Sequence, residues 1–238
     1  MNQVRKTSLI FGLFFAGTFI FSIPALFFYD PVLKDTNYIL GGGFDTRISV
    51  GALFEILLAI CNIATAIVIF PIVKRAKEAV ALGYVASRIV ESLLILAGVI
   101  SLMSIMTLRA NFAPGSDTNT LSIVGRSLLA LHDWTFLLGP QFCAGFGNGL
   151  LLGYLMYRSG LVPPRMALLG LVGGPLAFVG GVLVLFDVLK PMSPGLIALT
   201  VLEVAWELSL TIYTIAKGFR PSPVLDGYGQ TGAPAAIR

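Results

Sequence analysis

The chain has 238 residues and a formal net charge of +4, with 56% hydrophobic and 12% charged residues. Soluble domains carry roughly 25% charged residues, so this composition argues against a soluble enzyme, a disordered chain and a disulfide-rich secreted module. Most cations stand at the ends of apolar runs and form no basic groove with interleaved aromatics. We therefore expect no nucleic-acid partner, and the predicted partner is the lipid bilayer.

Six apolar segments follow one another, at about 7–29, 48–73, 79–108, 127–157, 166–188 and 196–217. Each is at least as long as the roughly 20 residues that a helix needs to cross a hydrocarbon core roughly 30 Å thick, and lipid offers the backbone no other hydrogen-bond partners. Breaks such as Asp30-Pro31 and the KRAKE run at 74–78 separate them. The predicted fold is an all-α, six-helix transmembrane bundle in a single domain over 1–217, followed by a disordered cytoplasmic tail over 218–238.

The basic residues divide unevenly between the two sides that six spans create. Of the 16 lysines and arginines, Arg88 lies inside a segment, ten lie on the side of the chain ends and five on the other side. Lysine and arginine concentrate in the cytoplasmic loops of membrane proteins. Both ends are therefore predicted to be cytoplasmic.

The fourth and fifth segments carry signals for helix packing. Pro140 removes a backbone hydrogen bond within the long fourth segment, which predicts a kink or an outer half-helix there. Small residues recur every four positions in both segments: Gly145, Gly149 and Gly153, then Gly173, Ala177 and Gly181. Such stripes let helix backbones approach closely. We expect packing within the chain, with contact between copies in a homo-oligomer as the alternative.

Ionisable side chains inside the segments are the candidates for function, because burying them in a bilayer is costly and they usually face the bundle interior. They are Glu55, Arg88, Glu91, His132, Asp133, Glu203 and Glu207, with Asn62 and Asn148 as polar companions. A helical rise of about 1.5 Å per residue places them in two layers. The central layer is expected to hold Asn62, Arg88, Glu91 and Glu207, and the layer nearer the outer surface Glu55, Glu203, His132 and Asp133.

Arg88 is the only cation at depth and shares a helix face with Glu91, three positions on; Glu203 and Glu207 share another. One interpretation is a structural ion pair of Arg88 with Glu91 or Glu207. The other makes Arg88 an anion-binding group, or a partner that tunes a proton-carrying glutamate. On the second interpretation the ligand-binding candidates are Arg88 and the four glutamates, Glu55 included.

His132 is the only histidine, and its neighbour Asp133 does not share its face on a regular helix. A structural hydrogen-bonding role is the ordinary expectation for such a histidine. The catalytic candidates are otherwise His132 and Asp133, with His132 as a proton acceptor or as a metal ligand alongside Glu55, Asp133 or Glu203. No spacing such as His-Glu-x-x-His occurs, and no cofactor is predicted.

Five stretches of the chain are distinctive: GALFE (51–55), ALGYVASR (81–88) with Glu91, LHDWTFLLGP (131–140), LGYLMY (152–157) and WELS (206–209). Together they resemble a family of bacterial multi-pass membrane proteins described as domain of unknown function 4386. The resemblance covers nearly the whole chain to Lys217, and the His-Asp-Trp block is its most specific part. It implies a protein of the bacterial inner (plasma) membrane and brings no assigned catalytic residues.

Three functions remain open from the sequence. The first is binding or movement of a small solute or ion at the buried carboxylates and Arg88, from the outer side. The second is an intramembrane hydrolase, with or without a metal, and the third is a non-catalytic membrane partner or regulator. We favour the first, because the polar groups outnumber what packing needs.

Overall fold

The computed structural model describes residues 1–41, 43, 45–111 and 117–229, and every regular element within these ranges is helical. Six α-helices are present there: α1 Gln3–Lys34, α2 Thr46–Ala110, α3 Thr118–Phe136, α4 Gly153–Ser159, α5 Pro164–Leu185 and α6 Pro194–Ala216. A π-helix, η2 (Leu137–Leu152), joins α3 to α4, and short 3-10 helices stand at Tyr38–Leu40 (η1) and Pro223–Leu225 (η3). The all-helical prediction is confirmed for this part of the chain. Four of its helices, α1, α2, α5 and α6, are long and apolar enough to cross a membrane.

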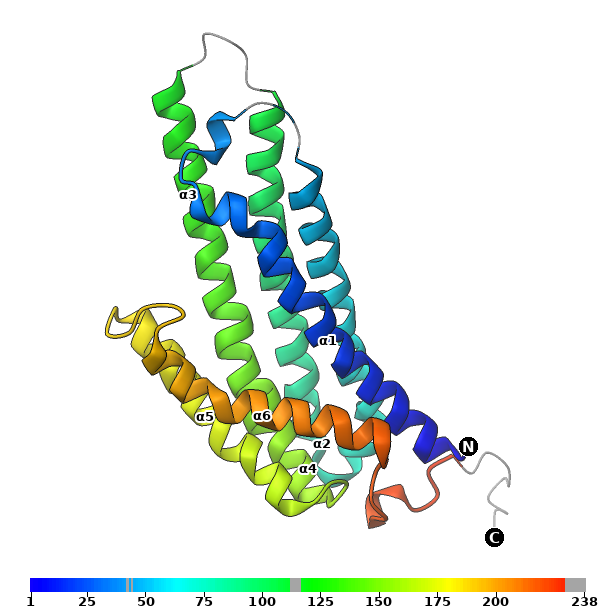
Figure 1. Ribbon diagram of the computed structural model, residues 1–238. Helices are drawn as coiled ribbons and strands as arrows, with labels where there is room; N and C mark the ends of the chain where they lie inside the picture. Colours follow the sequence, from blue (N-terminus) through cyan, green and yellow to red (C-terminus); the bar gives the residue numbers. More distant parts are fainter. Residues whose placement is uncertain (42, 44, 112–116, 230–238) are drawn as a thin grey trace.

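Helix α1, helix α2 and the run α3–η2–α4 extend along most of the height of the molecule, and α5 and α6 pack across their lower half (Figure 1). Helix α2 folds back at its lower end, where Lys77 has an extended backbone (φ −163°, ψ 100°). This break divides α2 into a descending arm, 46–76, and an ascending arm, 78–110. It lies inside the KRAKE run, where the sequence predicts the turn between two segments.

Pro31 lies inside α1, which corrects the predicted break at Asp30-Pro31. A proline has no N–H to donate to the carbonyl four residues back, here that of Phe27. Arg47 Nη2 donates to the Phe27 oxygen instead, at 2.5 Å. Lys34 also pairs with Asp30 at 2.7 Å across this turn. The helix therefore continues beyond its predicted end at residue 29.

The predicted fourth segment starts earlier than expected, because Asp117 caps α3 by accepting hydrogen bonds from the backbone N–H groups of Asn119 and Thr120. The helix changes from α to π geometry at Leu137, just before Pro140. A π-helix is rare and often accompanies a functional site. The disturbance predicted at Pro140 thus takes the form of a change of helix type.

The small-residue stripes pack η2, α5 and α6 against one another. A Cβ added to Gly149 would stand 2.2 Å from Gly174 Cα, and one added to Gly145 would stand 2.8 Å from the Gly174 carbonyl oxygen. On the other face of α5, a Cβ at Gly173 would stand 2.6 Å from the backbone nitrogen of Glu203 in α6. The stripes therefore serve packing within the chain, as expected. Contact between two copies through the same residues would require these helices to separate.

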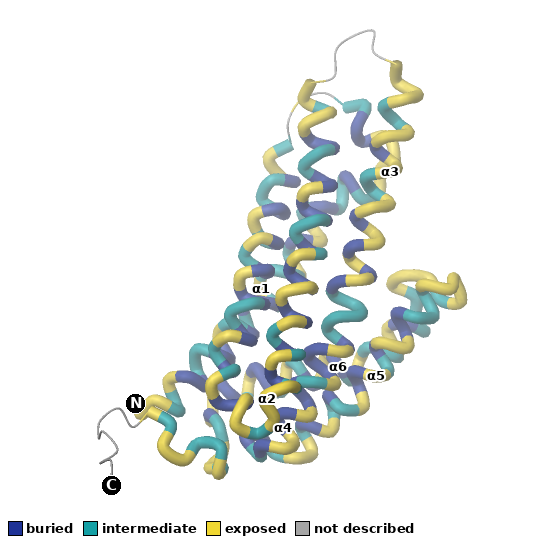
Figure 2. The backbone as a smooth tube through the Cα atoms, turned by 180° about the vertical axis from the view of Figure 1, so that it is seen from behind, coloured by how far each residue is buried: buried dark blue, intermediate teal, exposed yellow. Residues whose placement is uncertain are grey.

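Exposed residues follow the outer faces of the long helices (Figure 2). Many are large and apolar, among them Ile67, Ile100 and Ile212. Soluble monomers rarely expose apolar surface over such an area, whereas lipid tails are as apolar as these side chains. The surface thus matches a membrane-embedded bundle.

Residues 218–229, for which the sequence predicts disorder, lie against the lower end of the bundle. Arg75 donates to the carbonyl oxygens of Val224 (3.3 Å) and Asp226 (2.9 Å) and stands over the Tyr228 ring. The Tyr228 hydroxyl lies 3.2 Å from that of Thr7 in α1. The partners in these contacts lie in distant segments of the chain, so the sequence of the tail itself has no pattern that predicts them. The rest of the predicted tail, 230–238, lies outside the described residues.

Candidate functional site

A cavity of about 260 Å³ lies in the interior of the bundle, with walls from α1, both arms of α2, the end of α3, η2, α5 and α6. Its polar lining includes Glu55, Asn62, Arg88, Glu91, Gln141, Asn148, Glu203 and Glu207. All five candidate ligand-binding residues from the sequence are therefore brought to one cavity. His132 and Asp133 are not part of its lining.

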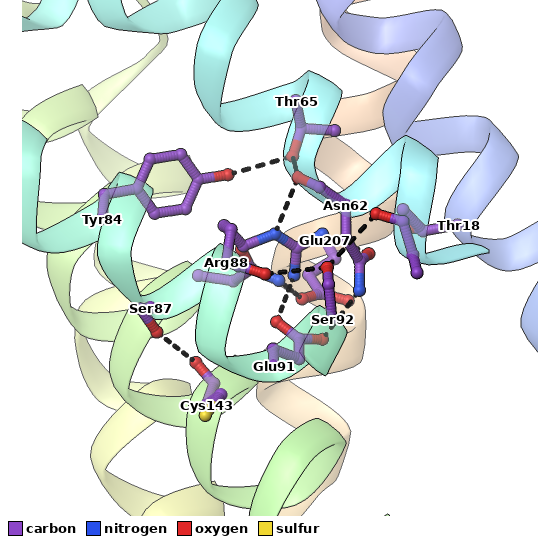
Figure 3. Close-up of polar contacts among 12 residues, drawn as sticks. Thr18, Asn62, Thr65, Tyr84, Ser87, Arg88, Glu91, Ser92, Cys143 and Glu207 are labelled. Atoms are coloured by element: carbon purple, nitrogen blue, oxygen red, sulfur yellow. Dashed lines mark hydrogen bonds and ion pairs between the residues drawn. The ribbon is translucent and has the colours of Figure 1, made fainter. Parts of the chain in front are cut away.

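Arg88 stands in a closed ring of polar contacts at the cavity wall (Figure 3). Its Nη1 donates to Glu91 Oε2 at 2.7 Å, its Nη2 to Asn62 Oδ1 at 2.5 Å and its Nε to the Asn62 carbonyl at 3.3 Å. Asn62 Nδ2 completes the ring with a 3.3 Å bond to Glu91 Oε1. Every nitrogen of this guanidinium, which is only 1% exposed, thus has an acceptor.

The ring also joins the two arms of α2. Arg88 and Glu91 lie one turn apart on the ascending arm, and Asn62 faces them from the descending arm. Ser92 adds a second link, because its Oγ lies 3.2 Å from the Ala59 carbonyl. The ion partner of Arg88 is therefore Glu91, from its own arm, and the predicted alternative through Glu207 is not the one formed.

Asn148 of η2 connects the cavity to α6. Its Nδ2 donates to Glu207 Oε1 at 2.6 Å, and its carbonyl accepts a 2.9 Å bond from Trp206 Nε1. Asn148 is 2% exposed, and its Oδ1 has no hydrogen-bond partner among the described residues. Glu207 lies beside the Arg88 ring in Figure 3. The π-helix thus places an amide beside the Glu207 carboxylate at the cavity wall.

Glu203 lies one helical turn from Glu207 and is 4% exposed. Both of its carboxylate oxygens are buried and lack a hydrogen-bond partner within the described part of the chain. The close approach of α5 and η2 explains the burial, because Gly173 contacts the Glu203 backbone and Gly149 faces its Oε2. A buried carboxylate without a partner is costly, and no described contact of Glu203 offsets this cost.

Tyr29 contacts both Glu55, at the cavity wall, and His132, which lies outside the lining. The Tyr29 hydroxyl donates to Glu55 Oε2 at 3.1 Å, and the Tyr29 ring meets the His132 ring edge-on with centroids 6.0 Å apart. His132 Nδ1 lies 3.6 Å from Asp133 Oδ1, too long for a hydrogen bond, and the Asp133 side chain is exposed. No group of three or more His, Cys, Asp or Glu side chains that could hold a metal occurs in the described ranges.

Several lining residues were missed from the sequence, among them Thr18, Gln141 and Thr200. Gln141 donates to the Ala177 carbonyl at 2.8 Å, and its polar side chain inside an apolar run is a signal that could have found it. Threonines give no such signal, because in helices they often bond their own backbone. Thr18 does so with the Phe15 carbonyl, at 2.7 Å.

The family model described as Domain of unknown function (DUF4386) matches residues 10–218. The match includes every residue named above for the cavity. No curated protein and no solved structure matches the chain.

Proposed function

The chain belongs to the family described as domain of unknown function (DUF4386), and from that premise we propose that it binds or moves a small solute or ion in its internal cavity. The proposal includes six membrane crossings: α1, the two arms of α2, the run α3–η2–α4, α5 and α6. Both ends would face the cytoplasm of a bacterial cell, with the protein in the inner membrane. The excess of lysine and arginine on the side of the chain ends supports this orientation.

The observation that carries the proposal is the state of Glu203. Its two oxygens are buried at the cavity without a partner in the described chain, and Asn148 Oδ1 is in the same condition. Buried polar groups are nearly always hydrogen-bonded in native proteins, and an exception calls for an explanation such as a ligand. A solute that satisfied these atoms would remove their desolvation cost.

A purely structural role explains only part of the cluster. The ring of Arg88, Glu91 and Asn62 is internally complete and already holds the arms of α2 together. Glu203 adds no contact to that ring. The cost of burying the Glu203 carboxylate without a hydrogen-bond partner therefore supports a role in solute binding in addition to any role in packing.

Access from the outer side is supported by the positions of the lining residues. Thr200 lies near the start of α6 and Glu55 near the start of α2, and both of these helix ends face outward in the proposed topology. The Arg88 ring lies deeper and would close the cytoplasmic side. Solute would thus enter from outside and meet Glu203 before Arg88.

The test is a solute survey on the purified protein in lipid nanodiscs. A solute that binds only the folded protein raises its unfolding temperature, so amines, sugars, carboxylates and inorganic ions are compared by thermal unfolding. Ala144→Phe places a large side chain in the cavity wall, and Ala205→Phe makes the same change at an exposed position of α6 outside the lining. We expect at least one solute to stabilise wild type and Ala205→Phe but not Ala144→Phe. Equal responses in all three proteins, or none in wild type, would refute the proposal.

A further inference from the structure

The fully buried unmatched atoms of the cavity wall are all hydrogen-bond acceptors. Among the fully buried side-chain atoms of the described lining, those without a partner are both oxygens of Glu203 and Oδ1 of Asn148. The bond from Asn148 Nδ2 to Glu207 fixes the orientation of that amide, because a carboxylate can only accept. A ligand that satisfies this wall must donate hydrogen bonds, and an ammonium group has three donors and no acceptor.

The charge balance of the lining points the same way. Arg88 is the only lysine or arginine among the described lining residues, and Glu91 and Asn62 occupy its guanidinium nitrogens. Glu55, Glu203 and Glu207 remain without a cation of their own. An anionic ligand would meet these carboxylates, whereas a cation would offset them.

The size of the cavity and the chemistry of its wall favour an organic cation over a bare ion. The cavity of about 260 Å³ is close to the lower end of the roughly 300–1,000 Å³ range of small-molecule pockets. Its apolar lining includes Phe19, Leu58, Ile95 and Phe136. These side chains suit the carbon skeleton of a ligand, and the two aromatic rings also suit a cation.

The mouth of the cavity is apolar too. Ile23 and Leu26 of α1 and Val204 of α6 line it and are 52%, 39% and 44% exposed, respectively. Helices α1 and α6 meet near the N-terminus, where Ser8 Oγ donates to the Thr214 carbonyl at 3.0 Å, and diverge above it (Figure 1). A ligand that crosses this rim needs apolar surface of its own.

We infer that the ligand class is a protonated organic amine with a small apolar group, its ammonium held by Glu203 with Asn148 and Glu207. The inference rests on the proposed function and narrows it. The apolar group lies against the Phe19 and Phe136 side of the cavity, towards the rim between α1 and α6.

Three probes of one shape and different charge test it: radiolabelled benzylamine, benzyl alcohol and benzoate. Each is equilibrated with wild-type protein in phosphatidylcholine nanodiscs, and binding to empty nanodiscs is subtracted. We expect saturable benzylamine binding, with the alcohol and the benzoate at least about tenfold weaker, since hydrogen bonds to charged groups are the strong ones. This comparison uses the native protein and depends on no variant.

Two isosteric variants then locate the ammonium. Glu203→Gln and Glu207→Gln should each weaken benzylamine binding at least about tenfold, while Glu78→Gln, at an exposed position outside the lining, should leave it unchanged. Equal binding of the three probes, or no loss in Glu203→Gln, overturns the amine inference and leaves the cavity function standing. Absence of benzylamine binding also overturns it, and the solute survey then decides separately whether the cavity binds anything.

Discussion

Arg88 and Glu91 are buried as a pair, so each depends on the other for its stability in the bundle. Arg88→Met leaves the Glu91 carboxylate, 5% exposed, without its cation. Breaking a buried pair from one side costs about 3–5 kcal/mol, whereas replacing both members by apolar residues is often neutral. We expect Arg88→Met to lose about that much unfolding free energy, and Arg88→Met/Glu91→Leu to recover most of it. Titration with denaturing detergent in mixed micelles measures the unfolding free energy of both variants. Equal losses in the single and the double variant would show that the ion pair does not account for the effect.

Asp45 and Tyr38 give a pH-dependent prediction beyond the membrane helices. The Tyr38 hydroxyl donates to Asp45 Oδ2 at 2.6 Å, and the backbone N–H of Arg47 donates to Oδ1 at 2.9 Å. Chiefly the Tyr38 bond lowers the pKa of Asp45 below its ordinary value. The carboxylate therefore adds stability above the unfolded pKa of about 3.9, and this contribution is lost as the pH falls through the lower folded pKa.

Tyr38→Phe tests this coupling, because phenylalanine keeps the ring over which Arg109 stands, 4.0 Å from the centroid. We expect the variant to unfold at a lower temperature than wild type at neutral pH, and the gap to narrow as the pH falls below about 4. Thermal unfolding at a series of pH values measures the gap. In an Asp45→Asn background, the difference in unfolding temperature caused by Tyr38→Phe should not vary with pH. If this difference also stayed constant with pH when Asp45 is present, the coupling would be contradicted.

At the scale of whole helices, the contact between η2 and α5 leaves no room for a side chain at Gly149. A Cβ at Gly149 would meet Gly174 Cα at 2.2 Å and Glu203 Oε2 at 2.4 Å, and backbone cannot move aside as a flexible side chain can. We expect Gly149→Ala to destabilise the bundle by about 1–3 kcal/mol through overpacking.

Gly83→Ala is the matched control for this substitution. Its added Cβ would meet Leu151 Cδ1 at 3.4 Å, an ordinary contact, within the regular helix α2. Alanine favours a helix interior over glycine by up to about 1 kcal/mol, so this variant should match wild type or exceed it. The same detergent titration compares the two, and an equal loss in both would mean that the glycine stripe is not the source of the effect.

The sequence predicts these elements well where the signal is local. Arg88 and Glu91 share a face by their spacing, and the turn in α2 falls within a charged run at Lys77. Pro31 is misread because the group that replaces its missing donor, Arg47, comes from another helix. The unpartnered state of Glu203 escapes prediction for the same reason, since it depends on how closely α5 and η2 approach α6.

At the scale of the molecule, two apolar cores are stacked along the long helices. The lower core joins α1, α2, α4, α5 and α6 around residues such as Phe11, Tyr84 and Trp206, and the upper core joins α1, α2 and η1 around Tyr29 and Ile105. Helices α5 and α6 reach only the lower part (Figure 1). The cavity lies where α5 and α6 cease to pack against the long helices. The bundle can therefore be firmly packed and still hold a polar cavity.

The proposed crossing pattern predicts which surface positions are accessible from outside the cell. Asn119, Lys77, Arg158 and Lys217 are all exposed, and each can be replaced by cysteine in a Cys61→Ser/Cys143→Ser background. If the two arms of α2 are separate crossings and the run α3–η2–α4 is a third, a membrane-impermeant maleimide should label Asn119→Cys in intact cells. Lys77→Cys, Arg158→Cys and Lys217→Cys should react only after permeabilisation, because lysine and arginine concentrate on the cytoplasmic side. Labelling of Lys77→Cys together with Asn119→Cys in intact cells would mean that the arms of α2 do not cross the membrane separately. The proposed access to the cavity from outside the cell would then be contradicted.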